Sequence, residues 1–192
     1  AMEMVRKGIT ARQIITKQSI ENAITVLMGI GGSTNAIMHL QAIHKEAGLG
    51  LLPLETFGIF SRNIPQVASV YPASPYDMVD FYEAGGVPAV MIELKDWLHT
   101  DCMTVSGRTV EENLNQERET TRREVIKTAK EPFHPNGGVS VLTGNMAPLG
   151  AVVKPAAIPE HLLTFTGTAN VYQSEQEACA AILSGEVKPG TM

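Results

Sequence analysis

A run of glycines and small hydrogen-bonding residues could form a binding site: Gly31, Gly32, Ser33, Thr34 and Asn35. The glycines would let the backbone approach a ligand closely. The Ser-Thr-Asn run favours the start of a helix, where free N–H groups and the positive end of the helix dipole attract an anion. The segment therefore predicts a site for a small acid or a phosphorylated ligand. It also fits an ordinary glycine turn followed by a helix cap.

Several longer segments of distinctive sequence follow one another along the chain: residues 28–40, 76–88, 104–109, 144–155, 165–172 and 174–178. In this order and at this spacing, the chain resembles the dihydroxy-acid dehydratase and phosphogluconate dehydratase family of hydro-lyases. The resemblance covers essentially all 192 residues. It is a resemblance to a middle section of such an enzyme.

The resemblance implies a parent enzyme that removes water from a 2,3-dihydroxy acid to give a 2-keto acid. An iron–sulfur cluster would act there as a Lewis acid, and Mg²⁺ would bind the carboxylate end. The family's cluster and metal ligands and its proposed base lie in segments outside the part matched here. The chain has only two cysteines, Cys102 and Cys179, far apart in the sequence. We therefore expect no catalytic residue and no metal ligand in this chain, and no activity from it alone.

What the chain is expected to contribute is the wall of the site. By the resemblance, Gly31 to Asn35 would lie near the cluster or the substrate's carboxylate. Asn145 and Lys154 flank a second loop, rich in glycine and proline, which we expect to face the substrate cleft. Lys154 offers a positive charge for a carboxylate or a phosphate. It is equally compatible with an ordinary surface lysine at a strand end.

Composition excludes several other classes of protein. The formal net charge is −5 with lysine and arginine scattered, and aromatic residues make up 5%, so no nucleic-acid-binding surface is predicted. No apolar run approaches the roughly 20 residues of a membrane span. The sparse cysteines suit a reducing, cytoplasmic compartment. Gly29–Ser33 follows a helical pattern and lacks the lysine of a phosphate-binding loop, so a nucleotide domain is not expected.

The first half is predicted to be mostly helical. Ile20, Ile24 and Leu27 repeat at helical spacing after a cap at Thr16 or Ser19. Further helices are expected at residues 33–48, 54–63, 76–84 and 87–98, and a short strand at 67–70.

The second half is predicted to contain short strands at residues 139–142, 151–153, 164–166 and 170–172, and then a helix that Ser174 caps. We divide the chain into residues 1–110, part of the N-terminal α/β domain; 111–132, a charged linker; and 133–192, the start of a β-rich domain. The fold class is α/β, comprising the mostly helical C-terminal part of an α/β/α domain and the first strands of an incomplete β-barrel-like domain.

Three functions remain open. The first is a fragment of a dehydratase for a branched dihydroxy acid in branched-chain amino-acid biosynthesis, a homodimer in the parent enzyme. The second is a fragment of a sugar-acid dehydratase that acts on a gluconate or pentonate. The third is a non-catalytic module that binds a small acid.

Overall fold

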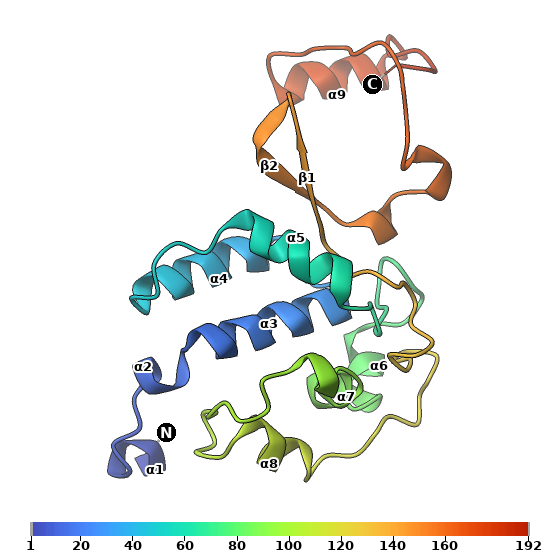
Figure 1. Cartoon of the computed structure of the whole chain (residues 1–192). Helices are drawn as coiled ribbons and strands as arrows, with labels where there is room; N and C mark the ends of the chain where they lie inside the picture. Colours follow the sequence, from blue (N-terminus) through green and yellow to red (C-terminus); the bar gives the residue numbers. More distant parts are fainter. Residues whose placement is uncertain (1, 192) are drawn as a thin grey trace. The chain divides into compact units, whose positions relative to one another are not determined.

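Helices form most of the regular structure in the computed structural model, which describes residues 2–191. The chain divides into two units, Ala1–Ala157 and Ile158–Met192. The elements of the first unit are α1 (Met2–Arg6), α2 (Ala11–Ile14), α3 (Lys17–Ile30), α4 (Asn35–Glu46), α5 (Leu54–Asn63), α6 (Met78–Glu83), α7 (Gly86–Glu93), η1 (Lys95–Trp97), α8 (Val110–Leu114), β1 (Ser140–Gly144), β2 (Ala147–Val153) and η2 (Pro155–Ala157) (Figure 1). The second unit contains η3 (Glu160–Leu162) and α9 (Glu175–Leu183).

The central element of the first unit is α3, which contacts α4, α5 and α7 (Figure 1). Its start is fixed by a reciprocal cap. The Ser19 N–H donates to Thr16 Oγ1 over 3.2 Å, and the Thr16 N–H donates to Ser19 Oγ over 2.9 Å. Ile24 and Met28 are fully buried with Phe57 of α5 and Val90 of α7. The predicted helix and its cap at Thr16 are therefore confirmed, as is the helix over residues 54–63.

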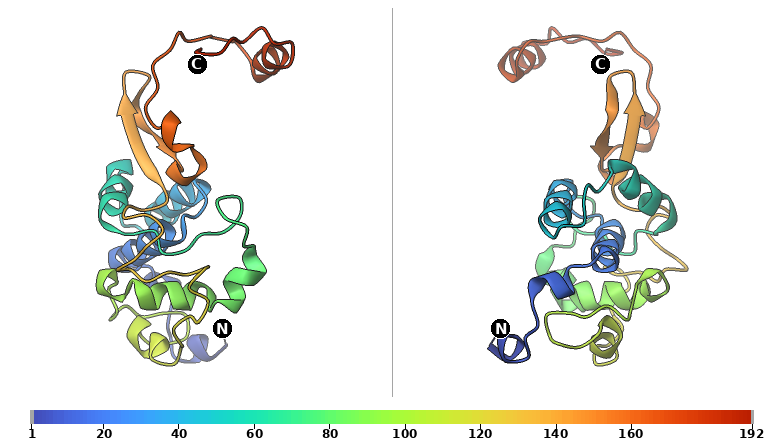
Figure 2. Two further views of the ribbon diagram at one scale, coloured as in Figure 1. Left: turned by 90° about the vertical axis from the view of Figure 1, so that its right-hand side faces the viewer. Right: turned by 60° about the vertical axis from the view of Figure 1, so that its left-hand side comes forward.

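The strands β1 and β2 form an antiparallel hairpin whose base packs on α5, as both views in Figure 2 show. Val141 and Val152 face each other across the hairpin and pack against the core. At Gly58 of α5 an added Cβ would lie 3.5 Å from Val141 Cβ, so the strand lies close to the helix. Within residues 2–191 this sheet has two strands and does not close. Helices with an unclosed sheet confirm the predicted incomplete α/β fold.

Three predicted strands do not form. Gln66 and Ala68 make single bridges to His134 and Ile126 instead of a continuous ladder. Residues 164–166 and 170–172 contain no strand, and side chains from 161 to 171 are exposed. β-prone residues need a continuous ladder to a neighbour and a buried face to form a strand. Here the side chains are exposed, and the pairing found within residues 2–191 is an isolated bridge between Thr168 and Thr191.

The charged segment 111–132, predicted to be a linker, includes residues that are part of the core. Val125 and Ile126 are fully buried, and the Lys127 N–H donates to the Val67 carbonyl over 2.8 Å. The charged side chains around these two residues hide the short apolar signal in the sequence.

In the second unit α9 begins as predicted, because the Ser174 hydroxyl accepts a hydrogen bond from the Glu177 N–H over 3.2 Å. None of the helices within residues 2–191 has the length and apolar character needed to cross a membrane.

Candidate functional site

A cavity of about 340 Å³ opens between the end of α3, α6 and the end of β2, all within the first unit. Its lining residues are Ile30, Gly31, Gly32, Ser33, Thr34, Ala68, Val70, Met78, Phe81 and Lys154. Five of the seven candidate residues thus meet at one place. Asn35 is exposed on α4, and Asn145 is exposed in the turn of the hairpin; neither lines the cavity.

The glycine turn is shaped by close packing of backbone on backbone. Gly31 ends α3 with φ of +61°, and a Cβ there would lie 2.7 Å from Gln66 Nε2. A Cβ on Gly138 would lie 2.3 Å from the Gly31 Cα. The Gly138 N–H also donates to the Met28 carbonyl over 3.0 Å. The two glycines therefore allow the segment before β1 to lie directly on the turn that forms one wall of the cavity.

Gln66 is a buried polar residue behind the glycine turn, and the sequence did not single it out. It is 3% exposed, and its Nε2 donates to the Ala68 carbonyl over 3.0 Å. Its backbone N–H donates to the His134 carbonyl over 2.9 Å. A single glutamine within the otherwise mostly apolar run from Ile64 to Val70 was the available signal, since a buried amide needs specific partners.

The start of α4 differs from the expected anion site. Thr34 has helical backbone angles, and its side chain makes no capping hydrogen bond. The Asn35 N–H donates to Ser33 Oγ over 3.2 Å, and the N–H groups of Ala36 and Ile37 donate to the carbonyls of Ser33 and Thr34. These N–H groups already have acceptors within the chain. The positive charge of the cavity therefore comes from Lys154.

Lys154 follows β2 directly and is half-buried at the cavity. Among residues 2–191, no carboxylate lies within ion-pair distance of its Nζ. The remaining lining is mostly apolar, apart from the hydroxyl groups of Ser33 and Thr34. A cation and two hydroxyls beside apolar walls are suited to a small acid with an aliphatic part.

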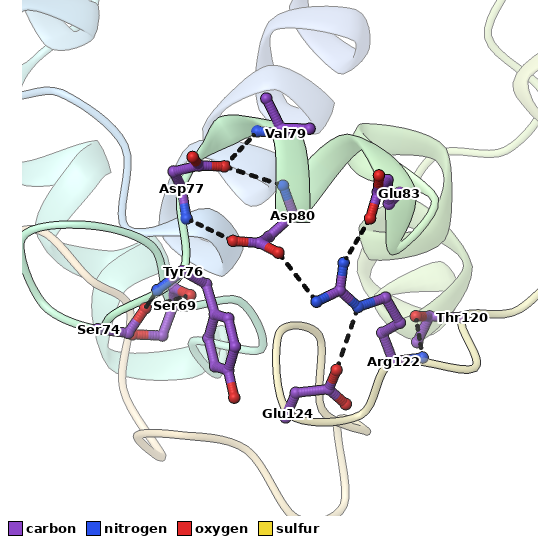
Figure 3. Close-up of polar contacts among 10 residues, drawn as sticks. All are labelled: Ser69, Ser74, Tyr76, Asp77, Val79, Asp80, Glu83, Thr120, Arg122 and Glu124. Atoms are coloured by element: carbon purple, nitrogen blue, oxygen red, sulfur yellow. Dashed lines mark hydrogen bonds and ion pairs between the residues drawn. The ribbon is translucent and has the colours of Figure 1, made fainter.

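A network of charges lies beside α6 (Figure 3). Asp77 caps the helix by accepting from the N–H groups of Val79 and Asp80, and the Asp80 carboxylate accepts from the Asp77 N–H over 3.0 Å. The same carboxylate forms an ion pair with Arg122. The acidic side chains of this helix thus make hydrogen bonds and ion pairs within the protein.

These contacts predict an acid dependence of stability. The pKa of Asp80 lies below its ordinary value of 3.8, first because of the Asp77 backbone N–H and then because of Arg122. A carboxyl group whose pKa is lowered by folding stabilises the protein at pH values above its ordinary pKa. This stabilisation is lost as the pH falls through the lowered pKa of the folded state. The urea midpoint should therefore fall between about pH 6 and about pH 3. The urea midpoint of the Asp80→Asn variant should fall less over the same range. Identical dependence of the midpoint on pH in the variant and the unaltered chain would contradict this prediction.

The described residues do not fit an iron–sulfur cluster or a Mg²⁺ site. Within residues 2–191, no three His, Cys, Asp or Glu side chains gather in a way that would hold a metal ion. Cys102 and Cys179 belong to different units. Burial, followed by the charge of Asp101, raises the pKa of the Cys102 thiol, which disfavours the thiolate that a metal requires.

Two family models match the chain, one on each side of the charged segment. Residues 1–113 match the N-terminal domain of the dihydroxy-acid/6-phosphogluconate dehydratases, and residues 124–192 match the C-terminal domain of the same family. The chain belongs to this family of dehydratases. The cavity is built from both matched regions, with Gly31 to Thr34 from the first and Lys154 from the second.

The similar curated proteins carry a more specific name. The chain is 47% identical to a dihydroxy-acid dehydratase of Methanosarcina barkeri, with 98% of this chain and 34% of the relative covered. It is 44% identical to the dihydroxy-acid dehydratase of Ignicoccus hospitalis, over 100% of this chain and 35% of the relative. It is 46% identical to the dihydroxy-acid dehydratase of Thermodesulfovibrio yellowstonii, over 98% of this chain and 34% of the relative. The chain therefore spans about a third of the length of these relatives.

Proposed function

We propose that this chain is the section of a dihydroxy-acid dehydratase that forms one wall of the substrate site, and that it binds the acid without catalysing its dehydration. The observation that carries this proposal is the shared cavity, where a lysine from the C-terminal region meets the glycine turn of the N-terminal region. In the whole enzyme a metal centre would supply the Lewis acid for the departing hydroxyl. That centre does not fit the residues described here.

Each part of the cavity is assigned to one part of a branched 2,3-dihydroxy acid. The ammonium of Lys154 pairs with the carboxylate, because a charged hydrogen bond is the strongest contact available there. The hydroxyls of Ser33 and Thr34 donate hydrogen bonds to the substrate's hydroxyls or accept hydrogen bonds from them. Val70 and Phe81 contact its aliphatic branch. The chain's contribution is therefore to bind and orient the acid.

A sugar acid is the second candidate, since the family name also includes a phosphogluconate dehydratase. The apolar lining favours the branched acid, because a sugar's extra hydroxyl groups would be buried there without hydrogen-bond partners. A homodimeric parent in branched-chain amino-acid biosynthesis, located in the cytoplasm, is proposed on the family resemblance alone.

Calorimetry on the 192-residue chain tests this function. We expect heat of binding with 2,3-dihydroxyisovalerate, weaker binding of gluconate, and no formation of the 2-keto acid from either. Stronger binding of gluconate would favour the sugar-acid alternative. No heat with either acid would contradict a binding role, and keto-acid formation by the chain alone would contradict its assignment as a non-catalytic section.

A further inference from the structure

Arg122 makes side-chain contacts with two carboxylates on α6 and with one on its own segment (Figure 3). Its Nη2 donates to Asp80 Oδ1 over 2.9 Å, and its Nη1 donates to Glu83 Oε2 over 2.9 Å. Its Nε donates to Glu124 Oε1 over 3.1 Å. The Arg122 guanidinium therefore binds α6 through two separate hydrogen bonds.

The helix held in this way forms one wall of the cavity. Met78 and Phe81 of α6 both line it. A helix of six residues does not form a stable unit by itself, so tertiary contacts set its position. Phe81 is 6% exposed and provides an apolar anchor, whereas Met78 is 64% exposed and has little to hold it in place. The bonds to Arg122 are the polar contacts that fix α6 on its other side.

The backbone around Arg122 is also joined to a second segment that lines the cavity, residues 68–70. The Arg122 carbonyl accepts from the N–H groups of Val125 and Ile126, over 3.0 and 3.1 Å. Ile126 makes a bridge to Ala68, which lines the cavity, and the Ser69 N–H donates to the Val125 carbonyl over 3.3 Å. The turn that carries Arg122 is thus hydrogen-bonded to residues 68–70, which include two lining residues of the cavity.

We propose that Arg122 is a positioning residue: it sets the place of α6 relative to residues 68–70 and so the fit of the cavity to its acid ligand. Its role in binding rests on the function proposed above. Arg122 itself does not line the cavity and lies between the two regions that match the family models. Ion pairs at the surface contribute little to global stability, so we expect its removal to change the cavity more than the fold.

The test compares Arg122→Gln with Arg123→Gln. Arg123 is a matched control because it is the neighbouring arginine and, like Arg122, pairs with more than one carboxylate; its partners are Glu93 and Glu119, neither of which belongs to α6. The first measurement is the NMR signal of the Met78 methyl group in methionine-labelled chain, assigned with Met78→Leu. We expect Arg122→Gln to shift or broaden this signal and Arg123→Gln to leave it in place.

The second measurement is the affinity for 2,3-dihydroxyisovalerate by calorimetry. We expect it to fall about tenfold in Arg122→Gln and less than about twofold in Arg123→Gln, with similar urea midpoints for both variants. An unchanged Met78 signal, or a moved signal with unchanged affinity, would overturn the proposal. A variant that fails to fold is replaced by Glu83→Ala, which removes the acceptor of one of the two bonds to α6 and should shift the Met78 signal in the same direction. No shift in Glu83→Ala would equally overturn the proposal.

The two measurements separate this inference from the proposed function. If the unaltered chain binds no acid, the proposed function fails. The Met78 signal then still decides whether Arg122 positions α6, because it needs no ligand.

Discussion

Gly138→Ala is expected to destabilise the first unit by about 3 kcal/mol, which is the upper part of the usual range for overpacking. The added methyl group would lie 2.3 Å from the Gly31 Cα and 2.9 Å from Gln66 Oε1. The nearest atom belongs to the backbone, and Gly31 ends α3 in a left-handed conformation, so neither segment can move without breaking the turn. Urea unfolding followed by circular dichroism measures the loss.

The control for this substitution is Gly144→Ala in the hairpin. An added Cβ at Gly144 meets no atom within 4 Å, so we expect a change within about 0.5 kcal/mol. Equal stability of the two variants would show that the segment before β1 does not lie on the glycine turn. Gly138→Ala should also weaken binding of the acid at a temperature where the variant is still folded, since the turn forms part of the cavity.

Lys154→Glu is expected to weaken binding of 2,3-dihydroxyisovalerate about a hundredfold. A hydrogen bond between charged groups contributes roughly 1.5–3 kcal/mol, and reversing the charge replaces attraction by repulsion. Calorimetry measures the dissociation constant directly. The lysine lies in the cavity without an ion-pair partner among residues 2–191, so replacing it breaks no ion pair between described residues.

Lys45→Glu is the matched control, because it changes the net charge by the same amount. Lys45 is exposed near the end of α4 and does not line the cavity. We expect less than a threefold change in affinity from its long-range field, which salt screens. If both variants weaken binding equally, the acid responds to overall charge and Lys154 has no specific role.

Much of the helical structure could be predicted because local signals agree with one another. The helix α3 has a cap at Thr16, a regular apolar face and a glycine at its end, and α5 has an equally clear pattern. The short strands could not be predicted in this way. Residues 67–70 and 164–172 are rich in β-prone types, but a strand requires a partner segment, which local sequence does not reveal.

The candidate site was predictable in part. Gly31, Gly32, Ser33, Thr34 and Lys154 line one cavity, and the family resemblance brought Lys154 into consideration together with the glycine turn. The anion site at the start of α4 stays a prediction; in the structure Ser33 and Thr34 accept hydrogen bonds from the first N–H groups of the helix. Gln66 and Arg122 were missed since their importance depends on contacts far along the chain.

Mapping by NMR tests most directly whether this cavity receives the acid. Amide signals of the uniformly labelled chain are followed during titration with 2,3-dihydroxyisovalerate. We expect the largest changes at Gly31 to Thr34 and at Lys154, with α9 unaffected. Changes confined to other parts of the chain, or saturable binding that leaves these signals unmoved, would contradict the account.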